Sequence, residues 1–471
     1  MGSMTSIPMT DTEALMWRLE RHRGLSSTFA NLAVLDQQPD IDRLRARLTR
    51  AAAAIPRLRQ RVDERAGRPR WFIDGDLDVD SHVRHVAVAT PGTKRELLDL
   101  AATITADPFD PTRPLWQFIV IDGLADGRSA LLQKVHHAIT DGQGGVELAT
   151  AYLDIERDPA DDDRADSDHA AALASAQSPE STDLDNVSSS DPSHDDTAER
   201  VRAALAGILR VPLGVRRQVG DLLAEPDSIA DANRAALRTL DDVGRELGAE
   251  RAASPLWTQR SSRRRLFTTE ASVSALGTAA RAFGGTVNAA FVTAAAEAAG
   301  DYHRRVGSPV DSLRASIAVS TRTDQSGSNA FTLARIDVPT AAMPIGERFA
   351  AVAAAIESAR AATPDRLVDT AAALGAALPT SLVARFAGAQ ARSIDIATSN
   401  VRGAPVDTFV AGARVVANVP IGPLLGVPVN LTALSQGDRF DIGVHIDPTA
   451  IDDSAMFAQC VDDAIARVQM M

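Results

Sequence analysis

The sequence predicts an α/β protein made of two layered domains, and three observations lead to this prediction. The chain has 471 residues, more than one hydrophobic core usually supports. Segments with helical periodicity alternate with apolar, β-branched segments in both halves of the chain, which is typical of α/β layers. Between the halves lies a stretch, 154–199, that is rich in Asp, Ser and Ala and poor in large aliphatic residues.

The first half shows helical patterns separated by proline and glycine. Ile41, Leu44 and Leu48 recur on one helical face, and Pro56 follows the end of that pattern. A polar turn at 123–128 joins two apolar runs, which we expect to pair as a hairpin. The expected helices are 40–54, 95–105 and 143–152, and the expected strands are 71–73, 83–88, 118–121 and 130–136.

The second half resumes the alternation at Arg265. Gly284 and Gly285 separate two helical patterns, and Pro379 interrupts an Ala-rich stretch at 370–384, which we interpret as a buried helix followed by the start of another. The expected helices are 272–283, 287–305, 345–362 and 456–469, and the expected strands are 266–269, 313–319, 394–399, 415–420, 429–435 and 440–446.

The distribution of charged residues also separates the two halves of the chain. Residues 154–199 hold 15 Asp and Glu against two Arg, so this stretch carries the whole formal net charge of −13. It has too little apolar area to offset the entropy of ordering it, and we predict a disordered, solvated linker. The predicted organisation is therefore a first domain at 1–153, a linker at 154–199 and a second domain at 200–471.

Composition excludes several classes of protein. The acidic total argues against a nucleic-acid partner. Because the residues outside the linker are charge-balanced, the total excludes neither a binding site for a CoA phosphate nor contact with an anionic membrane. Cys460 is the single cysteine, so no intramolecular disulfide and no multi-cysteine metal site can form. No signal pattern and no apolar run of membrane-spanning length is present, and we expect a cytoplasmic protein.

The segment 200–224 has a basic amphipathic pattern. Apolar residues share one face, and Arg210, Arg216 and Arg217 lie nearby. Such a helix can lie on a membrane surface. It can equally pack against the rest of the protein.

The strongest candidate for chemistry is the run from Val135 to Gly142, VHHAITDG. It brings two adjacent histidines to the end of an apolar strand, with Asp141 close behind. Histidine titrates near neutral pH and can accept a proton from an alcohol. Adjacent strand residues point to opposite faces, so one histidine can enter a given cleft. A buried histidine pair and a metal-ligand pair are the alternatives, but opposite-facing neighbours are poor joint ligands and no metal site is expected.

These residues resemble the HHxxxDG signature of the CoA-dependent acyltransferase superfamily, which includes chloramphenicol acetyltransferase and condensation domains. Further blocks are similar to the bacterial wax ester synthase/diacylglycerol acyltransferase family. They are PRLRQR at 56–61, PLW at 114–116, SNVRGAP at 399–405, PIGP at 420–423 and GVHID at 443–447. The resemblance covers nearly the whole chain outside the acidic stretch.

The resemblance implies roles for named residues. It implies that His137 is the general base that takes the proton of the acyl acceptor's hydroxyl. It implies that His136 supports the loop or the substrate tunnel beside His137 in the catalytic motif. Asp141 resembles the structural aspartate of the motif, for which Arg322 is the candidate partner; a surface position for Arg322 is the alternative.

A developing oxyanion needs a positioned donor. Asn288 lies in a segment similar to the family's TVND block, and we expect Asn288, together with Gly142, to stabilise the oxyanion or orient the substrate. Asn288 could instead cap the helix that starts there. Ala289 stands where the family has aspartate. His445, on an expected strand, is either a remnant of a duplicated architecture or a half-buried strand residue, and Trp116 is expected to pack in the core.

As a whole, the resemblance implies two chloramphenicol-acetyltransferase-like domains, each a mixed sheet with packed helices, and an active-site tunnel at their interface. The implied substrates are acyl-CoA, as co-substrate and not a cofactor, and diacylglycerol or a long-chain alcohol. Both acceptors partition into lipid, so peripheral contact with the inner face of the plasma membrane or with lipid droplets is expected. An acyltransferase for another lipid or polyketide hydroxyl and a weakly active lipid-binding paralogue are the alternatives.

Overall fold

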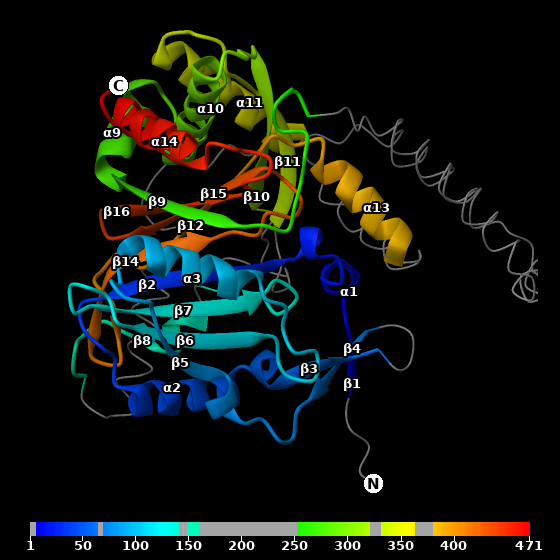
Figure 1. Cartoon of the computed structure of the whole chain (residues 1–471), viewed down its shortest axis with the longest axis vertical. Helices are drawn as coiled ribbons and strands as arrows, with labels where there is room; N and C mark the ends of the chain where they lie inside the picture. The colour runs from blue at the N-terminus through cyan, green and yellow to red at the C-terminus, as the bar shows by residue number, and fades with distance from the viewer. Residues whose placement is uncertain are drawn as a thin grey trace, which may run out of the picture. The chain divides into compact units, whose positions relative to one another are not determined.

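The computed structural model describes residues 6–64, 69–140, 145, 148–159, 252–320, 331–362 and 380–471. These residues belong to one compact unit that contains two large mixed β-sheets with helices packed against them (Figure 1). The predicted α/β class is therefore confirmed. Most of the predicted linker, 160–199, and the whole basic segment 200–224 lie outside the described residues.

The first sheet has seven strands among the described residues, in the order β5-β6-β7-β2-β14-β13-β8. Strands β6 and β7 pair antiparallel, as the predicted hairpin requires. Every residue of β7 is buried, because β6 and β2 flank it and both of its faces are covered. The strands are β2 (Thr28–Leu35), β5 (Val83–Ala87), β6 (Trp116–Asp122), β7 (Ser129–His136), β8 (Leu153–Asp154), β13 (Phe409–Val410) and β14 (Ala413–Ile421).

The second sheet has six strands in the described part of the chain, in the order β11-β10-β12-β15-β16-β9. β12 lies between β10 and β15 and runs parallel to both, while the remaining pairs are antiparallel. The strands are β9 (Arg265–Ser272), β10 (Ser312–Ser320), β11 (Phe331–Pro339), β12 (Ile396–Arg402), β15 (Val429–Gln436) and β16 (Arg439–Ile446).

A helical layer covers the second sheet at the top of Figure 1. Its central helix is Ala-rich and almost entirely buried, because small side chains let neighbouring helices and the sheet approach closely. The helices are α9 (Val273–Ala282), α10 (Val287–Arg305), α11 (Ile345–Ala362) and α14 (Ser454–Gln469).

Two helices cover opposite faces of the first sheet. Helix α2 (Ile41–Ala54) starts at Asp40, whose carboxylate accepts hydrogen bonds from two backbone N–H groups of the first turn. It packs in a cluster with Leu35, whereas α3 (Lys94–Ala106) packs in another cluster with Leu32. Helix α3 also touches the second half of the chain, where Arg95 donates a hydrogen bond to the Leu266 carbonyl at 2.9 Å. The helix therefore connects the two halves.

Strand β14 crosses from the second half into the first sheet. It follows β12 and β13 in the chain, yet it pairs with β2, while the next strands, β15 and β16, return to the second sheet. The crossing requires close contact with β16, because a Cβ atom at position 443 would overlap the Pro420 carbonyl oxygen. Gly443 is therefore the residue that lets β14 pass over β16.

Several elements near the N-terminus were not predicted from the sequence. A small sheet forms in the order β1-β4-β3, and helix α1 contacts α13. The missed strand β2 is the most consequential, since it pairs with both β7 and β14. The unpredicted elements are β1 (Ser6–Pro8), α1 (Asp11–Leu19) and β3 (Gln60–Asp63), with short 3-10 turns at Arg23–Leu25, Pro56–Arg59 and Val79–Ser81. Strand β4 (Arg70–Ile73) matches the expected strand 71–73, and α13 (Thr380–Ala391) begins directly after Pro379, where the start of a helix was expected.

The first residue of the predicted linker is part of the folded unit. Asp154, its first residue, closes strand β8 and is 1% exposed. Its carboxylate pairs with Arg43 at 2.9 Å and with Arg47 at 2.6 Å, both on α2. The charge of the stretch 154–199 did not predict this pairing, because Arg43 and Arg47 lie more than a hundred residues earlier in the chain. The division into domains at 1–153 and 200–471 stays a prediction.

Candidate active site

Strand β7 delivers the two adjacent histidines to one place. His136 is the last residue of β7, and His137 is the first residue of the turn that follows. The backbone N–H of His137 donates to the Ser27 carbonyl at 3.3 Å, and its ring lies 4.6 Å from that of Phe29, centroid to centroid. His137 is partly exposed. Its position is thus fixed by the start of β2.

His136 is in a different environment. It is fully buried, and its Nδ1 accepts a hydrogen bond from the Ala138 N–H at 3.0 Å. An Nδ1 that accepts leaves the ring proton on Nε2 in the neutral imidazole. Nε2 lies 3.1 Å from a carboxylate oxygen of Glu20 and donates to it. Both nitrogens of His136 are therefore engaged within the protein, which fits the supporting role expected of it.

Glu20, which no sequence motif indicated, stabilises this arrangement. Its carboxylate accepts hydrogen bonds from the Ser26 hydroxyl at 2.7 Å, the Ser27 N–H at 2.9 Å and the Thr28 hydroxyl at 3.3 Å, besides His136. Burial alone would raise the pKa of Glu20, but the hydrogen bonds from His136, Ser26 and Ser27 lower it to about 2. Ionised Glu20 thus fixes the Ser26–Thr28 turn, whose Ser27 carbonyl holds His137.

Three of the predicted site residues lie outside the described residues. They are Asp141, Gly142 and Arg322. The pairing of Asp141 with Arg322 and the orienting role of Gly142 therefore stay predictions.

Asn288 lies in the first turn of α10, but it is not the cap of that helix. Thr286 is the N-cap, and its hydroxyl accepts a hydrogen bond from the Ala289 N–H at 3.2 Å. Ala289 is 3% exposed in the apolar core of the second half. The alanine that replaces the family's aspartate is thus buried, and Thr286 caps the helix. The oxyanion role of Asn288 stays a prediction.

The two N-terminal family blocks meet in the core of the first half. The indole N–H of Trp116 donates to the carbonyl of Leu58 at 2.8 Å, and His82 stacks on the indole ring. Both Trp116 and Leu115 are fully buried. The predicted packing role of Trp116 is confirmed.

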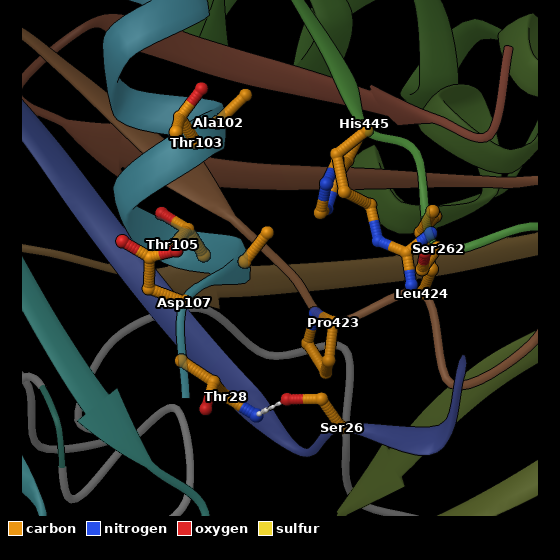
Figure 2. Close-up of a pocket in the computed structure, with 12 residues that line it drawn as sticks. Ser26, Thr28, Ala102, Thr103, Thr105, Asp107, Ser262, Pro423, Leu424 and His445 are labelled. Atoms are coloured by element: carbon orange, nitrogen blue, oxygen red, sulfur yellow. Dashed lines mark hydrogen bonds between the residues drawn. The ribbon is translucent and has the colours of Figure 1, made fainter. Parts of the chain in front are cut away.

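A cavity of about 250 Å³ lies between the two halves (Figure 2). The end of α3 and the start of β2 form one side, and residues of the second half form the other. Neither His137 nor Asn288 lines it, but Ser26 and Thr28 do, and these residues bind Glu20. The cavity thus adjoins the network that supports the histidine turn. Its lining comprises Ser26, Thr28, Ala102, Thr103, Thr105, Ala106, Asp107, Ser262, Arg264, Pro423, Leu424 and His445.

Comparison with known proteins decides the family. A family model described as the wax ester synthase/diacylglycerol acyltransferase catalytic domain matches residues 9–291, and the model of the family's C-terminal domain matches residues 327–469. The chain belongs to the wax ester synthase/diacylglycerol acyltransferase family. It carries both of the domains that define this acyltransferase family, as the sequence motifs predicted.

Individual relatives of this acyltransferase agree. The chain is 33% identical to a Mycobacterium tuberculosis (strain H37Rv) protein that carries the name diacylglycerol O-acyltransferase Rv2484c, over 95% of this chain and 88% of the relative. It is 26% identical to the protein named diacylglycerol O-acyltransferase Tgs1 of the same organism, over 95% of this chain and 92% of that one. Both relatives align with nearly the full length of the acyltransferase.

Solved structures show the same fold. The wax ester synthase/diacylglycerol acyltransferase of Marinobacter aquaeolei VT8 matches with a TM-score of 0.66 at 21% identity, over 98% of this chain and 99% of that one. The starter condensation domain of rhizomide synthetase RzmA matches with a TM-score of 0.56 at 14% identity, over 99% and 94%. The two-domain fold implied by the resemblance is confirmed.

In the described segments of this acyltransferase, no cluster of three or more His, Cys, Asp or Glu is arranged to hold a metal ion. No helix within those segments is long and apolar enough to cross a membrane.

Proposed function

We propose that this acyltransferase moves a long-chain acyl group from acyl-CoA to the hydroxyl of diacylglycerol or of a long-chain alcohol, with His137 as the general base. The observation that carries the proposal is the contrast between the adjacent histidines. His136 is fully buried, whereas His137 is partly exposed, and its backbone N–H is bonded to the start of β2. His137 is therefore the histidine of the pair that a substrate can reach.

The family and its neighbours support the choice of substrates. The family model and the mycobacterial relatives are named for wax esters and diacylglycerol. One RzmA condensation-domain structure is described as a complex with C8-CoA and Leu-SNAC. An acyl thioester donor and a hydroxyl acceptor therefore suit the fold of this chain.

In the proposed reaction, His137 accepts the acceptor's hydroxyl proton as the oxygen bonds to the thioester carbonyl carbon. The carbon–sulfur bond then breaks, and the coenzyme A thiolate takes a proton from the imidazolium and leaves as the thiol. The ester is released and His137 returns to its neutral form. Asn288 is the proposed donor to the carbonyl oxygen, which carries the negative charge between these steps. No cofactor besides the co-substrate is proposed.

A panel of acceptors tests the function. Purified protein is incubated with palmitoyl-CoA and dioleoylglycerol, hexadecanol or no acceptor, and both the free thiol and the ester product are measured. We expect thiol release to depend on an acceptor and to match ester formation. Tight binding of palmitoyl-CoA with no ester from either acceptor would contradict the proposal and favour the lipid-binding paralogue. Ester formation with a polyketide or glycolipid hydroxyl alone would favour the other alternative.

Peripheral membrane contact is a separate proposal. It rests on the basic pattern of 200–224, which lies outside the described residues, and on substrates that partition into lipid. The proposed site of action is the cytoplasmic surface of the plasma membrane or a lipid droplet.

A further inference from the structure

Strand β7 carries a buried lysine on the same face as His136. Lys134 is 1% exposed, although lysine is almost never fully buried unless it is paired. Ala130 and Leu132, which precede it on that face of the strand, pack in the apolar cluster with α3. An apolar side chain would continue this pattern, so a charge at position 134 needs another explanation.

The ammonium group of Lys134 lies at the end of α3. Its Nζ donates a hydrogen bond to the carbonyl of Asp107 at 2.6 Å, and Asp107 is the C-cap of that helix. A cation is favourable there, because the last carbonyl groups of a helix carry partial negative charge. Nζ also lies 4.5 Å from the ring centroid of Phe109, which is 6.4 Å from that of His136. Lys134 and His136 thus share an aromatic neighbour.

The charged form of Lys134 costs stability. Burial lowers the pKa of Lys134 to about 8, against the attraction of the Asp107 and Glu20 carboxylates, and Arg84 lowers it further. The ammonium is therefore still charged at pH 7. Its cost is fully present below pH 8 and declines as the pH rises towards 10.5, the ordinary value. A buried charge that lowers stability at neutral pH indicates a role in function.

The turn after β7 requires the neutral form of His136. Its Nδ1 accepts the Ala138 N–H at 3.0 Å, while its Nε2 donates to Glu20. A second ring proton would have to bind Nδ1, and it would break the bond to Ala138, since both nitrogens of an imidazolium are donors. The buried anion of Glu20 attracts such a proton, whereas a positive charge nearby repels it.

The charged and titratable groups around Lys134 and His136 come from several elements. They are Glu20 after α1, Arg84 on β5 and Asp107 at the end of α3, with Arg264 and His445 across the adjoining cavity. The flanking strands β2 and β6 present uncharged Ala30 and Gln117 opposite Lys134. Glu20 interacts with both Lys134 and His136, so it couples the charge of one to the protonation of the other.

We propose that Lys134 is a positioning residue, whose buried positive charge balances Glu20 and keeps His136 neutral. Neutral His136 holds the turn that carries His137, which remains the base. The effect of Lys134 on catalysis rests on the proposed acyl transfer, but the protonation of His136 can be measured without turnover.

Nuclear magnetic resonance of the full chain labelled with 15N-histidine tests this balance directly. The signal of His136 is assigned by its loss in His136→Gln. In Lys134→Met, which keeps the length of the side chain without its charge, His136 should gain its second ring proton at a pH about one unit higher than in wild type, the scale of a nearby charge. Lys134→Arg, which keeps the charge, should behave like wild type. The melting temperature of Lys134→Met at pH 7 should hold or rise, because the variant removes a buried charge.

The rate of ester formation tests the consequence. At pH 6.5 we expect Lys134→Met to lose about tenfold in kcat, the order of one lost hydrogen bond, with an unchanged KM for palmitoyl-CoA. The rate should recover at pH 9, where His136 is neutral again. Lys94→Met is the matched control, since it removes the other lysine of the chain, at the exposed start of α3. This control should match wild type at both pH values.

Two results would overturn the proposal. Identical titration of His136 in wild type and in Lys134→Met would mean that Lys134 does not balance Glu20. A loss of rate that is equal at both pH values, together with a lower melting temperature, would make Lys134 a purely structural residue of β7. The resonance experiment does not depend on ester formation, so the failure of this inference is distinguishable from failure of the proposed acyl transfer.

Discussion

At the scale of single residues, the site depends on groups that do not touch the substrate. Glu20 accepts hydrogen bonds from His136 and from the turn that holds His137. Its carboxylate must be ionised to accept all of them. The chemistry proposed for His137 therefore depends on a carboxylate at the end of α1.

Glu20→Gln should destabilise the protein in a pH-dependent way. The folded pKa of about 2 is below the ordinary value of 4.5, so ionised Glu20 contributes stability above pH 4.5 that is lost as the pH falls towards 2. The contribution at neutral pH is on the order of 3 kcal/mol. Urea unfolding of wild type and variant at pH 6 and at pH 3 should show the gap in stability narrowing at the lower pH.

A matched variant controls this experiment. Glu357→Gln replaces a largely exposed carboxylate on α11, and it should change stability little at either pH. A gap for Glu20→Gln that stays the same at both pH values would contradict the role of the ionised carboxylate.

The sequence predicted some of these residues as parts of the site and not others. The histidine pair and its strand were predictable, because an apolar run leads directly into the motif. Glu20 was not, since its partner His136 lies 116 residues away and no local pattern links them. The capping box of Thr10 and Glu13 is the signal that could have predicted helix α1. It would have placed Glu20 at the end of that helix without revealing its partner.

At the scale of elements, periodicity predicted the helices and strands better than their pairing. The expected spans of α10 and α11 match the structure, because Ala-rich helical patterns with glycine or proline at their ends are local signals. The insertion of β14 beside β2 was not predicted. It depends on contacts between strands almost four hundred residues apart, which one sequence does not show.

Gly443→Ala should weaken the β14 crossing. The added methyl group would overlap the Pro420 carbonyl oxygen, which is backbone and cannot turn away. Overpacking of this kind typically costs about 1–3 kcal/mol and occasionally more. Urea unfolding should show a lower midpoint, and Gly75→Ala, where nothing lies within 4 Å of the added atom, should leave the midpoint almost unchanged. Equal midpoints for both variants would contradict the close passage.

At the scale of the whole molecule, the halves form one working unit. Helix α3 contacts β9, β14 joins the first sheet, and the cavity takes its walls from both halves. The sequence predicted an interface between the halves but not the strand that crosses it. The net charge of −13 says little about the described fold. It lies in residues 154–199, of which the structure describes 154–159.

The membrane proposal belongs to this scale. Replacing Arg210, Arg216 and Arg217 with Ser should lower the fraction that co-sediments with phosphatidylserine vesicles. Each basic residue near an anionic surface contributes about 1 kcal/mol, so three should change the partition coefficient by about a hundredfold. Raising the salt concentration should weaken wild-type binding in the same direction.

The control for this experiment removes equal charge elsewhere. The control variant replaces three arginines from other parts of the chain with Ser. Their side chains are about half exposed, and they are Arg113, Arg128 and Arg414. This triple variant should sediment like wild type. Equal losses in both triple variants would mean that net charge alone governs binding, and would contradict a specific basic segment.

The central claim is that His137 takes the acceptor's proton. The most direct measurement is the rate of ester formation by His137→Ala, with palmitoyl-CoA and the best acceptor of the panel. General-base catalysis contributes about 10²–10⁴ in rate, so the variant should lose at least a hundredfold while still binding palmitoyl-CoA. His85→Ala, at an exposed position on β5, should keep the wild-type rate. Ester formation by His137→Ala within a few-fold of wild type would contradict the account.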